Sequence, residues 1–162
     1  MTGRLFDPPS VGWVESRLVG RMETAAREAF LADLLAVAPA LYEEAAPAVL
    51  LHDDFSHHNL GFSPDGRRVL GVFDFTNACL GDPHRDLRYA FTFEPFAEAM
   101  IAEYEAARNV RLERSRLRAW HAWSAMASLA WDLGEGEPER LPARWGWVDQ
   151  VASWDRAFLR DL

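Results

Sequence analysis

The chain has 162 residues and carries 25 acidic side chains against 17 basic ones, so its formal net charge is −8. This length fits a single domain, and a hydrophobic content of 49% is enough to build a core, which excludes general disorder. The negative charge disfavours binding to nucleic acid or to an anionic membrane, and no apolar run is long enough to cross a bilayer.

The first part of the chain is expected to form an irregular segment followed by a helix. Residues 1–12 are the expected irregular segment. Residues 1–10 lack the basic start and apolar stretch of a signal peptide, which predicts a cytoplasmic protein. Residues 13–20 alternate weakly between polar and apolar side chains, which favours a short strand or extended segment. Residues 21–37 carry apolar side chains at spacings of three and four, which predicts a helix that Pro39 interrupts. A short helix is expected over residues 40–46.

The middle of the chain has the pattern of short strands. Residues 48–51 form an apolar run that is typical of a buried strand. Residues 60–62 and 68–73 are apolar and flank the tetrapeptide 63–66, Ser-Pro-Asp-Gly. Proline, aspartate and glycine in this order favour a type I turn closed by a left-handed glycine, so we expect a β-hairpin.

The remainder of the chain is expected to be helical. The predicted helices cover residues 84–93, 95–108, 113–132 and 140–160, with a break at the Gly/Pro-containing segment 134–138. The sequence therefore predicts a mostly helical α+β fold, in which a small β-hairpin core packs on a bundle of helices.

The polar residues of the middle segment are grouped at the ends of the predicted strands. Asp54 and Asn59 follow the strand at 48–51, and Asp74 ends the second arm of the hairpin that Asn59 begins. Antiparallel pairing would place Asn59 and Asp74 within about 8 Å of each other. Amide and carboxylate oxygens suit Mg²⁺, and a separate aspartate can accept a proton from an attacking hydroxyl. The pattern predicts a magnesium site beside a general base.

Three linked motifs in this region resemble those of a known family. The motifs are HDDFSHHN at 52–59, VFDF at 72–75 and GDPHRDL at 81–87. Their order and spacing resemble the core of the aminoglycoside phosphotransferase and choline kinase family, protein-kinase-like enzymes that phosphorylate hydroxyl groups of small molecules. The resemblance implies that Asp54 is the catalytic base and that His52 braces the catalytic loop. It also implies that Asn59 and Asp74 bind Mg²⁺ next to ATP or GTP.

The resemblance implies supporting roles for two further aspartates. Asp86 would hydrogen-bond the backbone of the catalytic loop, and Asp82 would cap the following helix, for which aspartate before proline is well suited. Asp53 departs from the family, because glycine or asparagine usually stands between the histidine and the catalytic aspartate. Both usual residues accept a left-handed backbone, which aspartate adopts less readily.

The N-terminal part departs further from the family. All 17 basic residues are arginine, so the chain has no lysine to grip nucleotide phosphates, and only about 50 residues precede Asp54. The expected fold is therefore the kinase-like large C-terminal lobe without its N-terminal lobe. Residues 12–20 resemble the hinge strand whose backbone contacts adenine, and this makes Glu15, Arg17 and Leu18 candidate nucleotide-binding residues.

This resemblance implies a division of the chain into a lead-in with a hinge segment, residues 1–20, and a large lobe, residues 21–162. Within the lobe, the expected parts are a catalytic loop at 50–60, a metal-site hairpin at 60–75 and a helical substrate subdomain at 84–162.

The expected function is Mg²⁺- and nucleotide-dependent phosphoryl transfer to a small-molecule hydroxyl, weak or absent in this chain alone. The alternative is a non-catalytic, pseudoenzyme-like module that binds a partner through its exposed nucleotide face. In either case a homodimer or a separate small-lobe protein is the expected macromolecular partner. A third interpretation is a magnesium-dependent hydrolase.

Two further side-chain groups allow more than one interpretation. Six of the seven tryptophans lie after residue 119, where core packing competes with a pocket for a cationic acceptor. The acidic residues beside them are Asp132, Glu135, Glu137 and Glu139. His57 and His58 could suggest zinc, but consecutive histidines point in different directions, which favours a loop surface.

Overall fold

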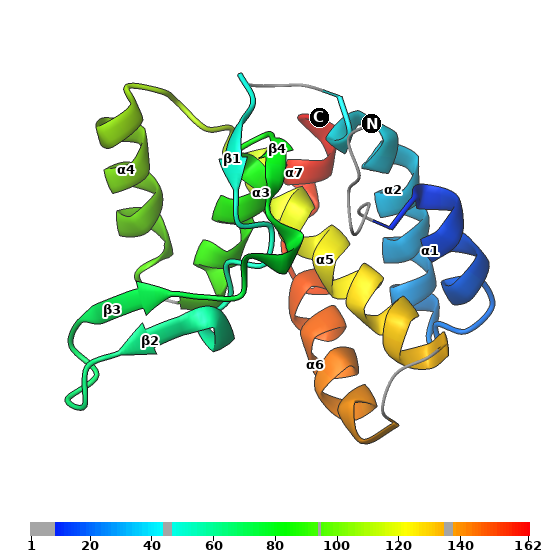
Figure 1. Ribbon diagram of the computed structural model, residues 1–162. Helices are drawn as coiled ribbons and strands as arrows, with labels where there is room; N and C mark the ends of the chain where they lie inside the picture. Colours follow the sequence, from blue (N-terminus) through cyan, green and yellow to red (C-terminus); the bar gives the residue numbers. More distant parts are fainter. Residues whose placement is uncertain (1–8, 44–46, 94, 135–137) are drawn as a thin grey trace, which may run out of the picture. The chain divides into compact units, whose positions relative to one another are not determined.

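Figure 1 shows the computed structural model of the chain. The structure describes residues 9–43, 47–93, 95–134 and 138–162. The chain divides into two compact units, of which one comprises described residues from 47 to 113 and the other comprises residues from 9 to 43 and from 114 onward. No helix within the described ranges is long and apolar enough to span a membrane.

The second of these units is helical and is organised around one long central helix. Helix α5 (Arg114–Gly134) contacts each of its other α-helices. These are α1 (Val11–Leu18), α2 (Ala25–Leu41), α6 (Leu141–Ala152) and α7 (Ala157–Arg160), and a 3₁₀ turn, η4 (Pro138–Arg140), precedes α6. The core includes the fully buried side chains Phe30, Leu34, Trp123, Met126 and Leu129. Six of the seven tryptophans lie on or next to α5 and α6, and Trp120 and Trp123 belong to this core.

Side chains that accept or donate backbone hydrogen bonds define the ends of the first two helices. The Ser10 hydroxyl accepts a hydrogen bond from the Trp13 N–H at 3.2 Å, and the Thr24 hydroxyl accepts one from the Arg27 N–H at 3.3 Å. At the other end of α2, the buried Arg116 guanidinium donates to the carbonyl oxygens of Ala40 and Leu41. These contacts satisfy backbone groups that a helix end leaves without a partner inside the helix.

The expected extended segment at residues 13–20 is wrong, because α1 covers most of it. Val14 and Leu18 lie one helical turn apart and are both fully buried. The apparent alternation was too weak to distinguish a strand from a short helix that buries one face. Ser10, the residue that caps this helix, is the sequence signal that favours it.

Two other helix boundaries differ from expectation. Pro39 lies inside α2, and the expected short helix at 40–46 is not present in its described part, because α2 continues to Leu41; residues 44–46 lie outside the described ranges. The expected helix at 140–160 is divided into α6 and α7. The Asp155 carboxylate accepts a hydrogen bond from the Ala157 N–H, a local contact that starts a new helix instead of continuing the old one.

The first unit contains two small antiparallel sheets. Strand β2 (Leu60–Phe62) pairs with β3 (Val69–Val72), and β1 (Val49–Leu51) pairs with β4 (Cys79–Gly81). The β2–β3 pair confirms the predicted hairpin: Gly66 has a φ of +68°, and its N–H donates to the Ser63 carbonyl at 2.8 Å. The β1–β4 pair was not predicted, because its strands are short and far apart in sequence.

Short helices complete this unit. Helix α3 (His84–Leu87) continues as the 3₁₀ segment η3 (Arg88–Phe93), so the single helix expected at 84–93 is only partly α-helical. Helix α4 (Ala97–Arg108) ends at Asn109, which has a left-handed backbone. Two further 3₁₀ turns are η1 (His57–Asn59) and η2 (Phe75–Asn77). The fold is thus mostly helical with a small β part, as the sequence predicts.

Candidate active site

Asp54 and Asn59 lie in the loop between β1 and β2 and contact each other directly. The Asn59 Nδ2 atom donates to the Asp54 backbone carbonyl at 2.8 Å and to Asp54 Oδ2 at 3.0 Å. Asn59 is buried at the end of η1, so this contact fixes the direction of the Asp54 side chain. Because the nitrogen of the amide is used in this way, Oδ1 is the atom of Asn59 that can bind a cation.

Asp74 lies two residues after β3 and directly follows Phe73, whose backbone contacts Asn59. The Phe73 N–H donates to the Asn59 carbonyl at 3.1 Å, which continues the β2–β3 ladder by one residue beyond the Leu60–Val72 pair. A regular strand would turn the next side chain to the opposite face. Asp74 instead has a left-handed backbone, with a φ of +62°, and there the chain leaves the strand and enters η2.

The Asp74 carboxylate is exposed and is held by its neighbour Thr76. The Thr76 hydroxyl donates to Asp74 Oδ1 at 2.7 Å, and the Thr76 N–H donates to the same atom. These hydrogen bonds lower the pKa of Asp74 below its ordinary value, so the side chain stays ionised at neutral pH. An accessible ionised carboxylate and an amide oxygen are hard ligands that fit Mg²⁺, which usually keeps several water or phosphate oxygens as well.

His52 connects the loop at residues 52–59 to the backbone next to Asp74. Its Nε2 lies 2.8 Å from the Phe73 carbonyl oxygen, and its Nδ1 accepts a hydrogen bond from the Asp54 N–H at 3.3 Å. Together the two contacts require the tautomer with the proton on Nε2. The buried imidazole therefore links the backbone next to Asp74 with the backbone of Asp54, as expected of a residue that braces the loop.

Asp86 binds the start of the same loop with both carboxylate oxygens. Its Oδ2 accepts a hydrogen bond from the His52 N–H and its Oδ1 one from the Asp53 N–H, each at 2.7 Å. Burial raises the pKa of Asp86, and the two backbone hydrogen bonds act in the opposite direction. This is the contact that the resemblance implies for Asp86.

Asp82 contacts the first residue of α3. Asp82 Oδ1 accepts a hydrogen bond from the His84 N–H at 3.0 Å and also contacts the His84 Nδ1 atom. On the other side of the ring, His84 Nε2 accepts a hydrogen bond from the Glu113 N–H at 3.0 Å. His84 is therefore a buried side chain with both ring nitrogens bonded, and Asp82 supports the beginning of the helix that carries Asp86.

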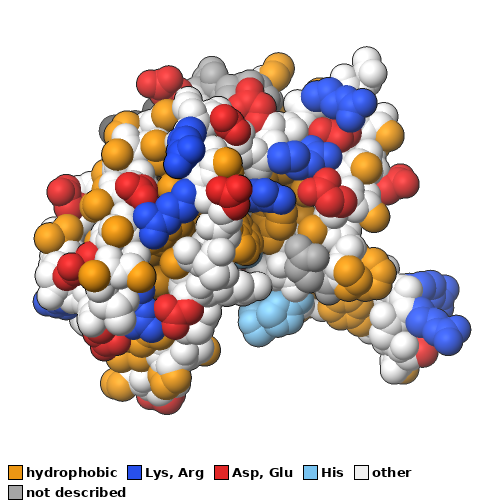
Figure 2. Space-filling model, turned by 180° about the vertical axis from the view of Figure 1, so that it is seen from behind, with side chains coloured by type: hydrophobic (Ala, Val, Ile, Leu, Met, Phe, Trp, Pro, Cys, Tyr) orange, Lys and Arg blue, Asp and Glu red, His pale blue; other side chains and the backbone are white. Residues whose placement is uncertain are grey.

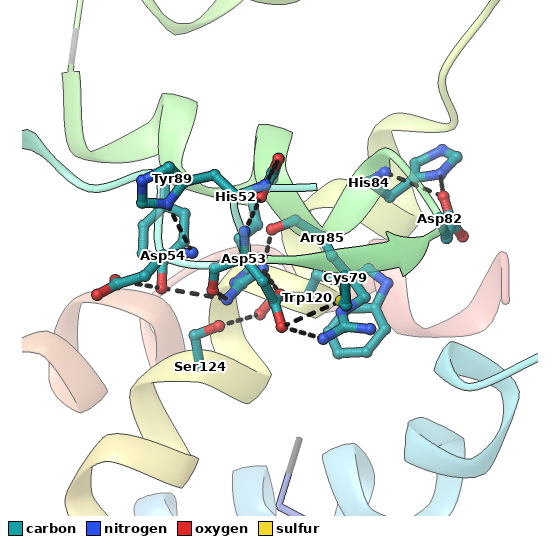
Figure 3. A network of polar contacts seen from close by, with 12 residues as sticks. His52, Asp53, Asp54, Cys79, Asp82, His84, Arg85, Tyr89, Trp120 and Ser124 are labelled. Carbon is teal, nitrogen blue, oxygen red and sulfur yellow. Dashed lines mark hydrogen bonds and ion pairs between the residues drawn. The ribbon is translucent and has the colours of Figure 1, made fainter. Parts of the chain in front are cut away.

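Asp53 has the left-handed backbone that its position in the motif requires, with a φ of +62°. Its carboxylate forms an ion pair with Arg85 (Figure 3) and another with Arg88. Arg88 also donates from Nη2 to the Asp53 carbonyl at 3.1 Å and to the Tyr89 hydroxyl at 3.1 Å. The Tyr89 hydroxyl in turn donates to Asp54 Oδ1 at 3.2 Å.

Arg85, Arg88 and Tyr89 were not identified from the sequence. The sequence did contain a signal for the arginines, namely the unusual carboxylate at Asp53. A carboxylate that becomes buried in the fold needs a cationic partner. Arg85 and Arg88 lie on either side of Asp86 and three residues apart, which places both on the side of α3 and η3 that carries the loop contact. No comparable signal exists for Tyr89.

The proposed nucleotide-binding residues of α1 do not have the backbone that a hinge requires. Glu15, Arg17 and Leu18 belong to the helical unit, where their segment is bonded as a helix and Leu18 is fully buried. The Arg17 guanidinium lies over the Trp13 ring, 4.4 Å from its centroid. A hinge strand contacts adenine through free backbone groups, and the helical backbone of this segment differs from that, so a nucleotide-binding role for residues 12–20 stays a prediction.

The other candidate groups occupy ordinary structural environments. Asp132 is buried and paired with Arg144, whose Nε lies 2.6 Å from its Oδ2, so this carboxylate serves an internal ion pair. Glu135 and Glu137 lie outside the described residues. His57 and His58 are exposed, with ring centroids 3.8 Å apart. In the described ranges, no group of three or more His, Cys, Asp or Glu side chains is placed to hold a metal ion, so a site at Asp74 depends on Asn59 as the second ligand.

Comparisons with known proteins place this geometry in a family. The family model described as "Phosphotransferase enzyme family" matches residues 2–125. Choline kinase LicA from Streptococcus pneumoniae superposes with a TM-score of 0.65 and 19% identity over 95% of this chain and 57% of its own. A thermostable mutant of aminoglycoside phosphotransferase APH(4)-Ia, apo form, gives a TM-score of 0.56 and 19% identity over 88% of this chain and 51% of its own.

A structure of a further variant of that thermostable phosphotransferase mutant is described as a ternary complex with AMP-PNP and hygromycin B. It matches with a TM-score of 0.56 and 20% identity over 90% of this chain and 48% of its own. The chain thus spans about half the length of the solved structures that it matches. The comparison with curated proteins gave no significant match. Since the family model covers most of the sequence, the chain belongs to the phosphotransferase enzyme family.

Proposed function

We propose that this chain carries the base and metal-binding residues of a Mg²⁺- and ATP-dependent phosphotransferase that acts on a hydroxyl group of a small molecule. In this proposal residues 50–60 are the catalytic loop, residues 60–75 are the metal-site hairpin and the helices after residue 84 hold the acceptor. The observation that carries the proposal is the position of Asn59. Its side chain binds Asp54, and its backbone pairs with the residue before Asp74.

The residues of this chain have complementary tasks in the proposed reaction. Asp54 accepts the proton of the acceptor hydroxyl while the oxygen of that hydroxyl bonds to the γ-phosphorus of ATP. The bond from that phosphorus to the β–γ bridging oxygen breaks, and ADP leaves with the electron pair of that bond. Mg²⁺, when bound by Asn59 and Asp74, neutralises charge on the phosphate oxygens. His52 and Asp86 keep the loop in position during the transfer.

ATP is preferred to GTP in this proposal because a structure with the same fold is a complex with AMP-PNP, an ATP analogue. The same complex contains hygromycin B, an aminoglycoside, and another similar structure is a choline kinase. Both acceptors are hydroxyl compounds that carry positive charge. A cationic alcohol is therefore the acceptor class to test first on this acidic chain.

The proposal is tested by calorimetric titration of Mg²⁺-ATP into the wild type and into Asp74→Asn. We expect saturable binding at millimolar nucleotide that requires Mg²⁺ and that Asp74→Asn weakens at least about tenfold, because one of two protein ligands loses its charge. Asp161→Asn is the matched control, since it removes one exposed carboxylate from the end of α7 in the other unit. If the wild type binds no Mg²⁺-ATP at millimolar concentration, the proposal is wrong. Equal binding by Asp74→Asn removes Asp74 from the metal site.

A second candidate function is a non-catalytic binding module, and the surface around Asp74 favours it. Leu70, Phe73 and Phe75 are 65%, 51% and 56% exposed, although they are large and apolar. Figure 2 shows hydrophobic side chains at the surface of the β2–β3 hairpin and arginines at its turn. An apolar surface of this kind is typical of a binding site. Light scattering tests whether a second copy covers it: a dimer that Leu70→Ser converts to a monomer supports this function, and a monomeric wild type at high concentration excludes self-association.

A further inference from the structure

Both carboxylate oxygens of Asp54 accept a hydrogen bond, each from a different segment of the chain. Asn59 donates to Oδ2 from the same loop, and the Tyr89 hydroxyl donates to Oδ1 from η3, at 3.2 Å. The Asn59 contact alone would leave the carboxylate able to rotate about its terminal bond. With a second donor on the other oxygen, the plane of the carboxylate is fixed.

Tyr89 is held by Arg88, the residue before it. The Arg88 guanidinium lies over the Tyr89 ring, 4.3 Å from the centroid, and its Nη2 donates to the Tyr89 hydroxyl at 3.1 Å. Since the hydroxyl oxygen accepts from Arg88, its single proton is directed to Asp54. The tyrosine is largely buried, and burial next to Asp54 and Asp53 raises its pKa, so it remains a proton donor in the hydrogen bond at neutral pH.

Arg88 is in turn fixed by Asp53, the neighbour of Asp54 in the loop. Arg88 is buried and bonds both the Asp53 carboxylate and the Asp53 carbonyl, and Arg85 pairs with the other oxygen of the same carboxylate. The Arg88 guanidinium also donates to the Arg85 carbonyl. The contacts thus form a chain from Asp53 through Arg88 and Tyr89 back to Asp54; Figure 3 labels Asp53, Tyr89 and Asp54.

We propose that Tyr89 is a positioning residue for the catalytic base Asp54, and that the Asp53–Arg88 ion pair places Tyr89 for this task. The inference rests on the proposed function, because it takes Asp54 to be the base. It assigns a role to Asp53, the residue that departs from the family motif: the carboxylate anchors the arginine that directs the tyrosine.

The test compares Tyr89→Phe with the wild type in two measurements. The first is steady-state hydrolysis of Mg²⁺-ATP, in which water replaces the unidentified acceptor. We expect kcat to fall about tenfold, as for loss of a hydrogen bond to a charged group, with the KM for Mg²⁺-ATP and the melting temperature nearly unchanged. Tyr104→Phe, on α4, is the control that removes a tyrosine hydroxyl with no hydrogen bond to Asp54, and it should leave kcat unchanged.

The second measurement is NMR of the protein with ¹³C-labelled aspartate and ¹⁵N-labelled asparagine, which does not need activity. Tyr89→Phe should shift the Asp54 carboxyl signal and the Asn59 side-chain amide signals, and Tyr104→Phe should not.

The outcomes separate this inference from the proposed function. An unchanged kcat in an active Tyr89→Phe enzyme overturns the positioning role and leaves phosphoryl transfer in place. A wild type without ATP hydrolysis counts against the proposed function, and the NMR signals then decide whether Tyr89 positions Asp54. If those signals are the same in Tyr89→Phe as in the wild type, the inference is wrong. A fall in melting temperature with a parallel rise in KM would mean that Tyr89 acts only in folding, which also overturns it.

Discussion

Removal of the Asp86 carboxylate should loosen the loop at residues 52–59 and leave the helical unit intact. In Asp86→Ala the N–H groups of His52 and Asp53 lose acceptors that lie 2.7 Å away. Hydrogen bonds to a charged acceptor contribute about 1.5–3 kcal/mol each, so the two together are worth about 3–6 kcal/mol. The raised pKa of Asp86 shows that its burial as an ion has a cost, which the alanine variant recovers. The expected net loss in local stability is about 2–4 kcal/mol.

Hydrogen exchange is the suitable measurement for Asp86→Ala, because tryptophan fluorescence reports on the other unit. All seven tryptophans belong to the helical unit, whereas Asp86 and the loop belong to the other. A loss of 2 kcal/mol corresponds to about 30-fold faster exchange of the His52 and Asp53 amides. We therefore expect at least that acceleration in Asp86→Ala, and none in the control Asp161→Ala.

Asp86→Asn separates hydrogen bonding from charge. The amide keeps one acceptor oxygen but sets its NH₂ group against the second backbone N–H, so exchange at one of the two amides should accelerate much more than at the other. The reasoning is refuted if His52 and Asp53 keep their protection in Asp86→Ala, since the loop would then hold its conformation without the carboxylate.

Two further predictions concern the helical unit. Leu129→Ala should lower the free energy of unfolding by about 2–5 kcal/mol, because Leu129 is fully buried on α5. Urea unfolding followed by tryptophan fluorescence measures this loss. A loss below about 1 kcal/mol would show that the surrounding side chains close around the smaller residue. The Arg27 guanidinium donates hydrogen bonds to Asp149 and holds the pKa of that carboxyl below its ordinary value. The pair therefore stabilises the fold at pH values above the unfolded-state pKa of about 3.9. This contribution is lost as the pH falls through the lower pKa of the folded state. The stability difference between wild type and Asp149→Asn should therefore be present at pH 7, at less than about 1 kcal/mol for an exposed pair, and should vanish at pH 2; a difference that persists at pH 2 contradicts the assignment.

The parts of the structure that the sequence predicted correctly depend on local interactions. The hairpin follows from the turn at 63–66, where a glycine with positive φ must stand at its end, and from the apolar arms on either side. Once this register is known, the proximity of Asn59 to the end of β3 follows as well. The fold class could be predicted for the same reason, since helical periodicity is a local pattern.

The parts that the sequence missed depend on contacts between distant segments or on short elements with weak patterns. Strand β4 has three residues, and only its pairing with β1 makes it a strand. Helix α1 is short, and two buried residues one turn apart are too few to show helical periodicity. The extended segment expected at residues 13–20 was wrong for this reason.

Asp53 shows where a departure from a motif carries information that the motif itself lacks. The sequence identified the aspartate as unusual, but its partners Arg85 and Arg88 follow more than thirty residues later, on either side of Asp86, whose carboxylate binds the loop backbone. A carboxylate that is buried without a cation is costly by several kcal/mol, and so is an arginine that loses its carboxylate. The three side chains are therefore energetically coupled, and glycine at position 53 would leave two buried arginines without their shared acceptor. Glycine, one of the two residues that are usual at this position in the family, is consequently unfavourable in this chain, although it would relieve the left-handed backbone.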